Sequence, residues 1–268
     1  VWNPTAVRPY RLAEVFSDSP PAPSKFKLLA EAHAALVSPM YSSDGRRLAA
    51  GGRDNVVRVW NAADGTPLKT LRGHAGQVRA VAFLPDSRRL VSAGHDGQIK
   101  LWDVDDYTET QAIAPQRFAG HADAVLGADV APDGETLVTA GRDRTAVVWN
   151  ARTAQSLTTL QEGHSFLTSS VATLPDGRRM MTSAVDGTTR LWDLVDGAEL
   201  RRFDRTGRAA APAVSHDGRL LATGGDGLVA QLWDLETGKL LRSLGPHRSE
   251  PTATAIAPDG RHVLTAGK

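Results

Sequence analysis

A histidine, a serine and an aspartate occur in this sequence at a spacing that could support acyl-transfer chemistry. Ser92 follows His74 by 18 residues, and Asp96 follows Ser92 by 4. In a hydrolase these residue types provide a nucleophilic hydroxyl, a general base and a carboxylate that orients the base. Taken alone, the set would predict a catalytic site.

The same set occurs three times, which favours a structural role. In each copy a tryptophan follows the aspartate by 6 residues. An active site is needed once, whereas a structural device is needed in every repeat, so we interpret the set as structural. Its members are His74, Ser92, Asp96 and Trp102; His121, Thr139, Asp143 and Trp149; and His164, Thr182, Asp186 and Trp192.

The tryptophans mark a longer repeat of β-strands. In the clearest copy, residues 73–103, three apolar runs cover 78–83, 88–93 and 98–103. Tight turns rich in Asp and Gly separate them, because a tight hairpin needs positive φ. A fourth run follows, so each period predicts one four-stranded blade of an all-β propeller. The tryptophans are Trp60, Trp102, Trp149, Trp192 and Trp233, at intervals of 42, 47, 43 and 41, and the fourth runs include 66–71, 154–160, 198–203 and 238–244.

Five complete blades and two complementary ends predict a closed ring of six blades. Residues 247–268 read as the first two strands of a closing blade, because His247 and Thr265 keep the spacing of 18. Residues 4–16 read as its outer strand, and the proline-rich segment 17–28 as a loop insertion. Closure would remove free sheet edges, which invite aggregation. A ring of seven blades would require further sequence.

Gly-His and Trp-Asp pairs bracket the copies, and in this the sequence resembles the WD-repeat family of β-propellers. The resemblance implies that the repeated set is a buried network, in which Asp accepts from His, and His and the hydroxyl lead on to the indole N–H. Two blades depart from this pattern, and we expect them to be less tightly held. The first blade has His33 and Asp54 but Ala50 at the hydroxyl position. The fifth blade has Asp226 but Ala222 at the hydroxyl position, and it has no matching histidine. The pairs are Gly73-His74, Gly120-His121 and Gly163-His164, with Trp102-Asp103, Trp192-Asp193 and Trp233-Asp234.

Composition and charge exclude several classes of protein. The 268 residues are 41% hydrophobic and 23% charged, which is ordinary for a globular chain with a sizeable core. Lys plus Arg total 31 and Asp plus Glu 30, so we expect no nucleic-acid partner and no membrane partner. There is no cysteine, and no apolar stretch approaches the roughly 18 residues that a membrane span needs.

Two further charged patterns are interpreted as solvated surface. Arginines follow the first turn of most copies and lie close to an acid, so we interpret them as local charge partners and not as a polyanion site. The run Asp103, Asp105 and Asp106 lacks the glycine and closing glutamate of a calcium loop. We predict no cofactor and no metal, because no phosphate loop, haem motif or zinc cluster occurs. The arginines are Arg46, Arg47, Arg88, Arg89, Arg178, Arg179, Arg219 and Arg261, and the acids are Asp44, Asp86, Asp176, Asp217 and Asp259.

A rigid ring of blades predicts a docking surface for a protein or peptide partner. The WD-repeat resemblance places the loops before the first strands and the turns before the third strands on one face, here called the top face. Residues just before the turn aspartates vary between blades, as a surface fitted to one asymmetric partner would. Phe166 either joins this surface or packs beneath its own loop. The candidate partner-binding residues are Arg53, Arg79, His95, Leu126, Arg142, Phe166, Leu167 and Val185, with Gly225 at the equivalent place in the fifth blade.

The alternative is a propeller enzyme or metal-dependent hydrolase acting in the central channel. It would need a unique set of acids, histidines or metal ligands facing the axis, whereas the inner strands are mostly Ala, Val, Ser and Thr. We therefore predict a non-catalytic interaction module, with residues 1–268 forming one propeller domain of a longer chain. The start lacks an initiator Met and a signal peptide, so we expect that the native start is missing. A cytoplasmic location is favoured, and export stays open because a signal could have been lost with that start. The composition indicates a bacterial source.

Overall fold

The described part of the chain is built from β-strands alone. The computed structural model describes residues 35–105, 116–118, 120–160, 163–204, 206, 211–225, 227–257 and 259–267. These residues form five four-stranded sheets and one two-stranded sheet, in which the strands pair antiparallel in chain order. The predicted fold class, an all-β propeller of four-stranded blades, is confirmed. No helix within these residues could cross a membrane.

The sheets are called blades 1 to 6 in chain order, and their strands have the following bounds. Blade 1 contains β1 (Leu36–Tyr41), β2 (Arg47–Gly52), β3 (Val56–Asn61) and β4 (Pro67–Arg72); blade 2 contains β5 (Val78–Phe83), β6 (Arg89–Gly94), β7 (Ile99–Asp103) and β8 (Gln116–Phe118). Blade 3 contains β9 (Val125–Val130), β10 (Thr136–Gly141), β11 (Ala146–Asn150) and β12 (Ser156–Leu160); blade 4 contains β13 (Thr168–Thr173), β14 (Arg179–Ala184), β15 (Thr188–Asp193) and β16 (Glu199–Asp204). Blade 5 contains β17 (Ala213–Val214), β18 (Leu220–Gly224), β19 (Ala230–Asp234) and β20 (Leu240–Leu244); blade 6 contains β21 (Pro251–Ile256) and β22 (Val263–Gly267).

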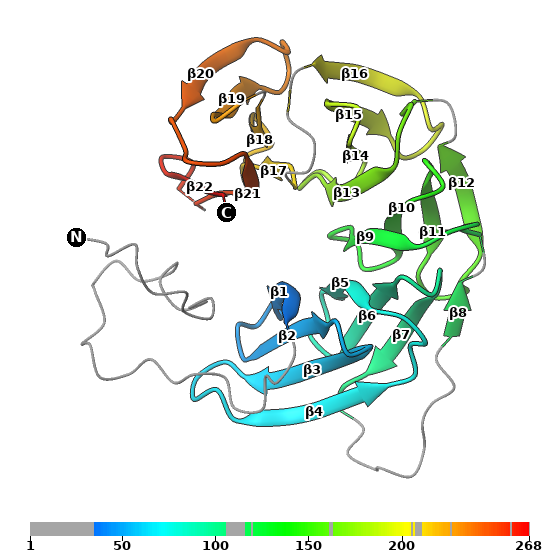
Figure 1. Cartoon of the computed structure of the whole chain (residues 1–268). Helices are drawn as coiled ribbons and strands as arrows, with labels where there is room; N and C mark the ends of the chain where they lie inside the picture. Colours follow the sequence, from blue (N-terminus) through cyan, green and yellow to red (C-terminus); the bar gives the residue numbers. More distant parts are fainter. Residues whose placement is uncertain are drawn as a thin grey trace.

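The blades lie side by side around a common centre. In Figure 1 the first strand of each blade lies nearest that centre, and the fourth strands of blades 1 to 5 form the rim. The predicted strands at 78–83, 88–93 and 98–103 agree with β5, β6 and β7 to within one residue. The turn between β6 and β7 contains Gly97 at φ 70°, the left-handed conformation that a tight hairpin requires.

The core lies between consecutive blades. Val91 of blade 2 packs with Leu137 and Trp149 of blade 3 in one buried cluster, and similar clusters join blades 1 to 2, 3 to 4 and 4 to 5. Trp149 has no exposed surface. Burying one such side chain contributes roughly 1.5 to 3 kcal/mol, so each blade holds its neighbour in place.

Blade 6 shows two strands within the described residues. His247 Nε2 and Thr265 Oγ1 lie 2.8 Å apart, as their spacing suggested. The predicted outer strand at 4–16 and the predicted loop insertion at 17–28 lie outside the described residues. The composite closing blade therefore stays a prediction.

Candidate functional site

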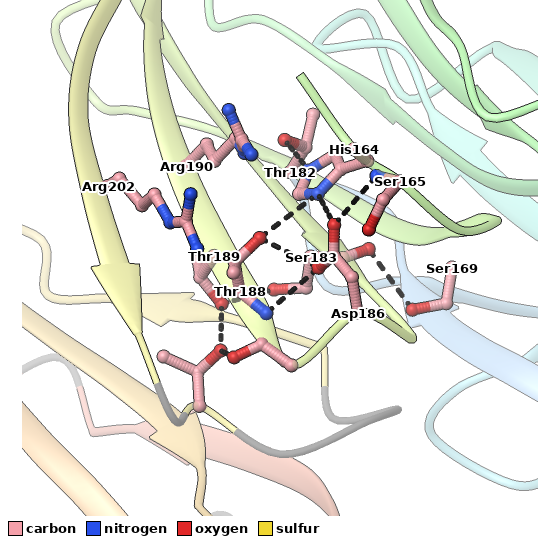
Figure 2. A network of polar contacts seen from close by, with 12 residues as sticks. His164, Ser165, Ser169, Thr182, Ser183, Asp186, Thr188, Thr189, Arg190 and Arg202 are labelled. Carbon is pink, nitrogen blue, oxygen red and sulfur yellow. Dashed lines mark hydrogen bonds and ion pairs between the residues drawn. The ribbon is translucent and has the colours of Figure 1, made fainter.

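A hydrogen-bonded chain of four side chains runs through blade 2. His74 Nδ1 lies 2.9 Å from Asp96 Oδ2, and His74 Nε2 lies 2.7 Å from Ser92 Oγ. Trp102 Nε1 donates to Ser92 Oγ at 2.7 Å. Figure 2 shows three of the corresponding side chains of blade 4, His164, Thr182 and Asp186, in contact with one another. The chain is formed by His121, Thr139, Asp143 and Trp149 in blade 3 and by His164, Thr182, Asp186 and Trp192 in blade 4.

The donors in this chain settle its proton positions. An indole N–H can only donate, so the hydroxyl accepts from Trp102 and donates its own proton to His74 Nε2. His74 Nδ1–H then donates to Asp96. The order matches that of a hydrolase triad, but a nucleophile must reach its substrate. Ser92, Thr139 and Thr182 are each 0% exposed, so none of the three hydroxyls can attack a bound molecule.

Burial and hydrogen bonding fix the charges in the network. Burial lowers the pKa of His74 and of His164 and outweighs the attraction of the neighbouring aspartates. Burial alone would raise the pKa of Asp96, but the hydrogen bonds from His74 and from Ala75 N–H outweigh it, so that pKa is lowered. Near neutral pH His74 and His164 are therefore neutral and Asp96 is ionised.

Blades 1 and 5 differ from this arrangement. In blade 1, Asp54 accepts hydrogen bonds from the guanidinium of Arg58, while His33 lies outside the described residues. For blade 5 the sequence predicts no hydroxyl beside the tryptophan, because Ala222 stands at that position. This prediction is wrong: Trp233 Nε1 donates to Thr223 Oγ1 at 3.0 Å. Thr223 precedes its tryptophan by 10 residues, as the other hydroxyls do. Asp226 lies outside the described residues.

The top-face turns are held by one repeated backbone contact. His95 N–H donates to the carbonyl of Gln77 at 2.9 Å, which fastens the turn between β6 and β7 to the loop before β5. The turn aspartate adds a second contact, since Asp96 also accepts from Ala75 N–H at 2.9 Å. The backbone bond recurs from Arg53 to Ala35, from Arg142 to Ala124 and from Val185 to Leu167.

The candidate partner-binding residues differ in exposure. Phe166 is 61% exposed, so the alternative in which it packs beneath its own loop is wrong. Arg53, His95 and Arg142 are exposed, whereas Gly225 is buried and offers a partner no side chain. The remaining members of the set are partly buried, namely Arg79, Leu126, Leu167 and Val185.

A cationic region lies on the top face of blades 2 and 3. Burial, together with the positive charges of Arg79 and Arg142, lowers the pKa of His95 and outweighs the opposing effect of Asp123 and Asp96. Sequence reasoning missed Arg144, which is exposed in the same turn as Arg142. The signal was available, because Asp143-Arg144 stands where blades 2 and 4 have Asp-Gly.

Arginines at the opposite end of the strands are largely paired. Arg89 and Arg179 each contact the acid of their own turn at 2.6 Å. Arg88 contacts Asp103 at 2.7 Å, and Arg47 pairs with Asp105 across the boundary between blades 1 and 2. These contacts leave Asp103 and Asp105 engaged with arginine.

Asp129 is an inner-strand acid that the repeat does not explain. It stands four residues before its turn aspartate, where blades 2 and 4 have Ala82 and Ala172. Its Oδ2 accepts from Thr173 N–H at 2.7 Å and Thr173 Oγ1–H at 2.8 Å, which ties β9 to β13. Desolvation raises its pKa above the ordinary aspartate value.

A comparison with known protein families agrees with the repeated blades and their tryptophan-linked networks. A family model described as "WD domain, G-beta repeat" matches residues 27–61, 65–103, 114–150 and 154–193, which is more than half of the chain. The chain belongs to the WD40 repeat family. Its WD40 blades 1 to 4 are the ones that the family model matches.

Curated relatives share single stretches of the WD40 repeats. WD repeat-containing protein slp1 of Schizosaccharomyces pombe is 47% identical over 45 residues, 17% of this chain and 9% of that protein. Ribosome assembly protein 4 of Chaetomium thermophilum is 48% identical over 48 residues, covering 18% and 9%. WD repeat and HMG-box DNA-binding protein 1 of Xenopus laevis is 46% identical over 46 residues, covering 17% and 4%. These matches span less than a tenth of each relative, and the eukaryotic sources do not support the bacterial source expected from composition.

Proposed function

We propose that this chain is a non-catalytic scaffold that docks a protein or peptide partner on the top face of its propeller. The observation that carries the proposal is the contrast between backbone and side chains on that face. Four turns are held by the same backbone hydrogen bond, yet the residues at that position are Arg53, His95, Arg142 and Val185. A constant framework that presents variable side chains suits recognition of one asymmetric partner.

The non-catalytic part of the proposal is supported by the burial of the repeated hydroxyls. In the described ranges, no group of three or more His, Cys, Asp or Glu side chains could hold a metal ion. The unusual acid Asp129 is already engaged by Thr173. A metal analysis and a broad esterase and lactonase screen test the alternative of a channel enzyme, and turnover or a bound metal would favour it.

A protein partner fits the charge balance better than a nucleic acid or a membrane does. One relative carries "DNA-binding" in its name, which describes that protein. In this chain 31 basic and 30 acidic residues give no extended basic surface charge. We further propose that the propeller is a single domain of a longer chain; a bacterial source stays a prediction from composition.

The test of the proposed function is a triple substitution on the top face. Arg53→Ala, Arg142→Ala and Phe166→Ala together should weaken binding of a purified partner at least tenfold, about 1.4 kcal/mol. The melting midpoint should stay unchanged, because Arg53, Arg142 and Phe166 are all exposed. Binding is measured by titration calorimetry, with the partner first isolated by affinity capture from the source organism.

A matched control carries equivalent changes away from the top face. Arg46→Ala, Arg219→Ala and Leu200→Ala remove two exposed arginines and one exposed apolar residue. This variant should bind the partner as the wild-type chain does. Wild-type affinity in the top-face variant, or equal weakening in the control, would contradict the proposed function.

A further inference from the structure

The residue after each turn aspartate adopts a left-handed conformation on the top face. Its φ is 68° at Asn55, 70° at Gly97, 69° at Arg144 and 79° at Gly187. Glycine and asparagine tolerate this conformation, whereas a long side chain with a Cβ is strained there. Blade 3 therefore carries an unfavourable residue at a position that the other blades fill with favourable ones.

Two other residues with positive φ, Ser87 and Ala154, replace glycine in the repeat, and both have local compensation. Ser87 Oγ accepts from Asp44 N–H at 3.1 Å, and Ala154 packs against the buried cluster between blades 2 and 3. The exposed Arg144 side chain makes no hydrogen bond or ion pair within the described residues. Strain without local compensation is a feature of functional sites.

The turn that carries Arg144 is joined through the backbone to the turn of blade 2. A Cβ on Gly97 would lie 3.3 Å from the carbonyl of Asp123, so the turn after His95 abuts the loop before β9. That loop is bonded in turn to the Arg142 turn through Ala124. We define the cationic strip as Arg79, Arg142 and Arg144. His95, beside Arg79 and Arg142, adds no positive charge near neutral pH because its pKa is lowered.

The strip has donors without acceptors. Arg79 Nε is buried and has no hydrogen-bond partner among the described residues. Three acids also lie in these turns: Asp96 and Asp143 accept from histidine within the buried network, and exposed Asp123 accepts from Ala124 N–H at 2.6 Å. None of the three forms an ion pair with Arg79, Arg142 or Arg144 within the described residues. A buried guanidinium nitrogen without an acceptor is costly. Because Nε itself is buried, a ligand carboxylate would contact the terminal nitrogens of the Arg79 side chain.

We propose that the cationic strip binds an acidic segment of a partner protein, whose carboxylates contact the guanidinium groups of Arg79, Arg142 and Arg144. The planar guanidinium pairs with carboxylate through two parallel hydrogen bonds, which gives orientation as well as attraction. Leu126, partly exposed beside the strip, gives an apolar residue of the segment a place to pack. This inference rests on the proposed top-face function and names the chemistry of its partner.

A nucleic acid suits the strip less well. Nucleic-acid binding depends on neutralising a run of phosphates along an extended basic track. Here the strip has three guanidinium groups on blades 2 and 3, the neighbouring blade 1 adds Arg53, and Arg88 and Arg178 on the opposite side are paired with acids. The net charge of the chain is only +1.

The test uses two short fluorescein-labelled peptides with the chain as it exists. One has a central Glu-Glu-Asp-Leu sequence and the other the uncharged Gln-Gln-Asn-Leu. Fluorescence anisotropy should show at least tenfold tighter binding of the acidic peptide. Arg144→Gly should weaken that binding several-fold while the melting midpoint stays constant or rises, because glycine relieves the strain at φ 69°. Adding Arg142→Ala should weaken it further.

The control for charge is Arg46→Ala with Arg219→Ala, which removes two exposed arginines at the other end of the strands and should leave peptide affinity unchanged. Equal affinity for the two peptides, or equal loss in the control, would overturn the inference. So would tighter, arginine-dependent binding of a labelled oligouridylate. In one outcome the Phe166→Ala variant fails to bind a purified partner while the Arg142→Ala, Arg144→Gly double variant binds it with wild-type affinity. That result would refute the acidic segment and leave the top-face function standing.

Discussion

The hydroxyls of Ser92, Thr139 and Thr182 each sit between an indole N–H and a histidine ring, 2.7 to 2.8 Å from both. A hydroxyl is suited to this place, because it accepts one hydrogen bond and donates another. Removing any member leaves a buried polar group without a partner, which costs about 1 to 3 kcal/mol. We therefore expect a side chain of the network to contribute more to the free energy of unfolding when it has more hydrogen-bond partners.

Asp143→Ala tests this role directly. The substitution removes the acceptor of His121 Nδ1–H and of Ala122 N–H, so we expect a loss of about 1 to 3 kcal/mol in the free energy of unfolding. Urea denaturation followed by tryptophan fluorescence measures it. Glu236→Ala is the control, because that side chain is 84% exposed. An unchanged denaturation midpoint for Asp143→Ala would contradict the structural role.

Acidification should destabilise the protein in two stages. The pKa values of His74 and His164 are lowered in the folded state, so their contribution is present above about pH 6.5 and is lost as pH falls below it. The lowered pKa values of Asp96 and Asp186 add a further loss below about pH 4. Thermal unfolding between pH 7 and pH 3 measures both stages.

The histidine stage has its own matched variants. His164→Gln should reduce the fall in melting midpoint between about pH 7 and pH 5, because it removes one buried titrating ring. The control is His216→Gln, which changes an exposed histidine and should leave the fall in melting midpoint unchanged. A midpoint that stays constant or rises on acidification would show that the histidines are not neutral in the folded chain.

Two single residues show where sequence reasoning reached its limit. Thr223 was missed because the hydroxyl was counted back from Asp226, and the register pairs Thr223 with Gln231 as it pairs Ser92 with Lys100. Counting from the tryptophan would have found it. The exposure of Phe166 could not be predicted, because the sequence does not show whether a loop folds over its own aromatic residue.

At the scale of elements, each blade combines a predictable framework with a less predictable connection. Alternating apolar residues and Asp-Gly turns fix the strands, which is why β5, β6 and β7 follow the predicted runs so closely. Contacts between blades depend on the neighbouring sheet. The bond from Thr173 to Asp129 joins two inner strands and follows no repeat, so no periodic pattern predicted it.

Blades 4 and 5 offer a matched comparison of one hydroxyl with two different numbers of partners. Thr182 serves His164 and Trp192, whereas Thr223 serves Trp233. Thr223→Val should therefore cost about 1 kcal/mol, and Thr182→Val about 2 to 3 kcal/mol, in the free energy of unfolding. Valine keeps the shape, so the difference reports the hydrogen bonds. Equal costs, measured by urea denaturation, would show that the histidine adds nothing to the chain of contacts.

At the scale of the whole molecule, buried clusters between consecutive blades join blades 1 to 5 into one body. This continuity lets turns from separate blades present a fixed surface, as the contact between Gly97 and the Asp123 loop illustrates. Ring closure through residues 4–16 stays a prediction, because that segment lies outside the described residues. The proposed docking site does not depend on it, since the cationic strip lies on blades 2 and 3.

The measurement that tests the central claim most directly is hydrogen–deuterium exchange of the chain with and without its purified partner. Docking on the top face predicts slower exchange at residues 76–79, 95–98, 123–126, 142–145 and 166–167. The turns at 44–46, 86–88 and 176–178, at the other end of the strands, should exchange at unchanged rates. Slower exchange confined to those opposite turns or to β21 and β22, with the top-face turns unaffected, would contradict the account.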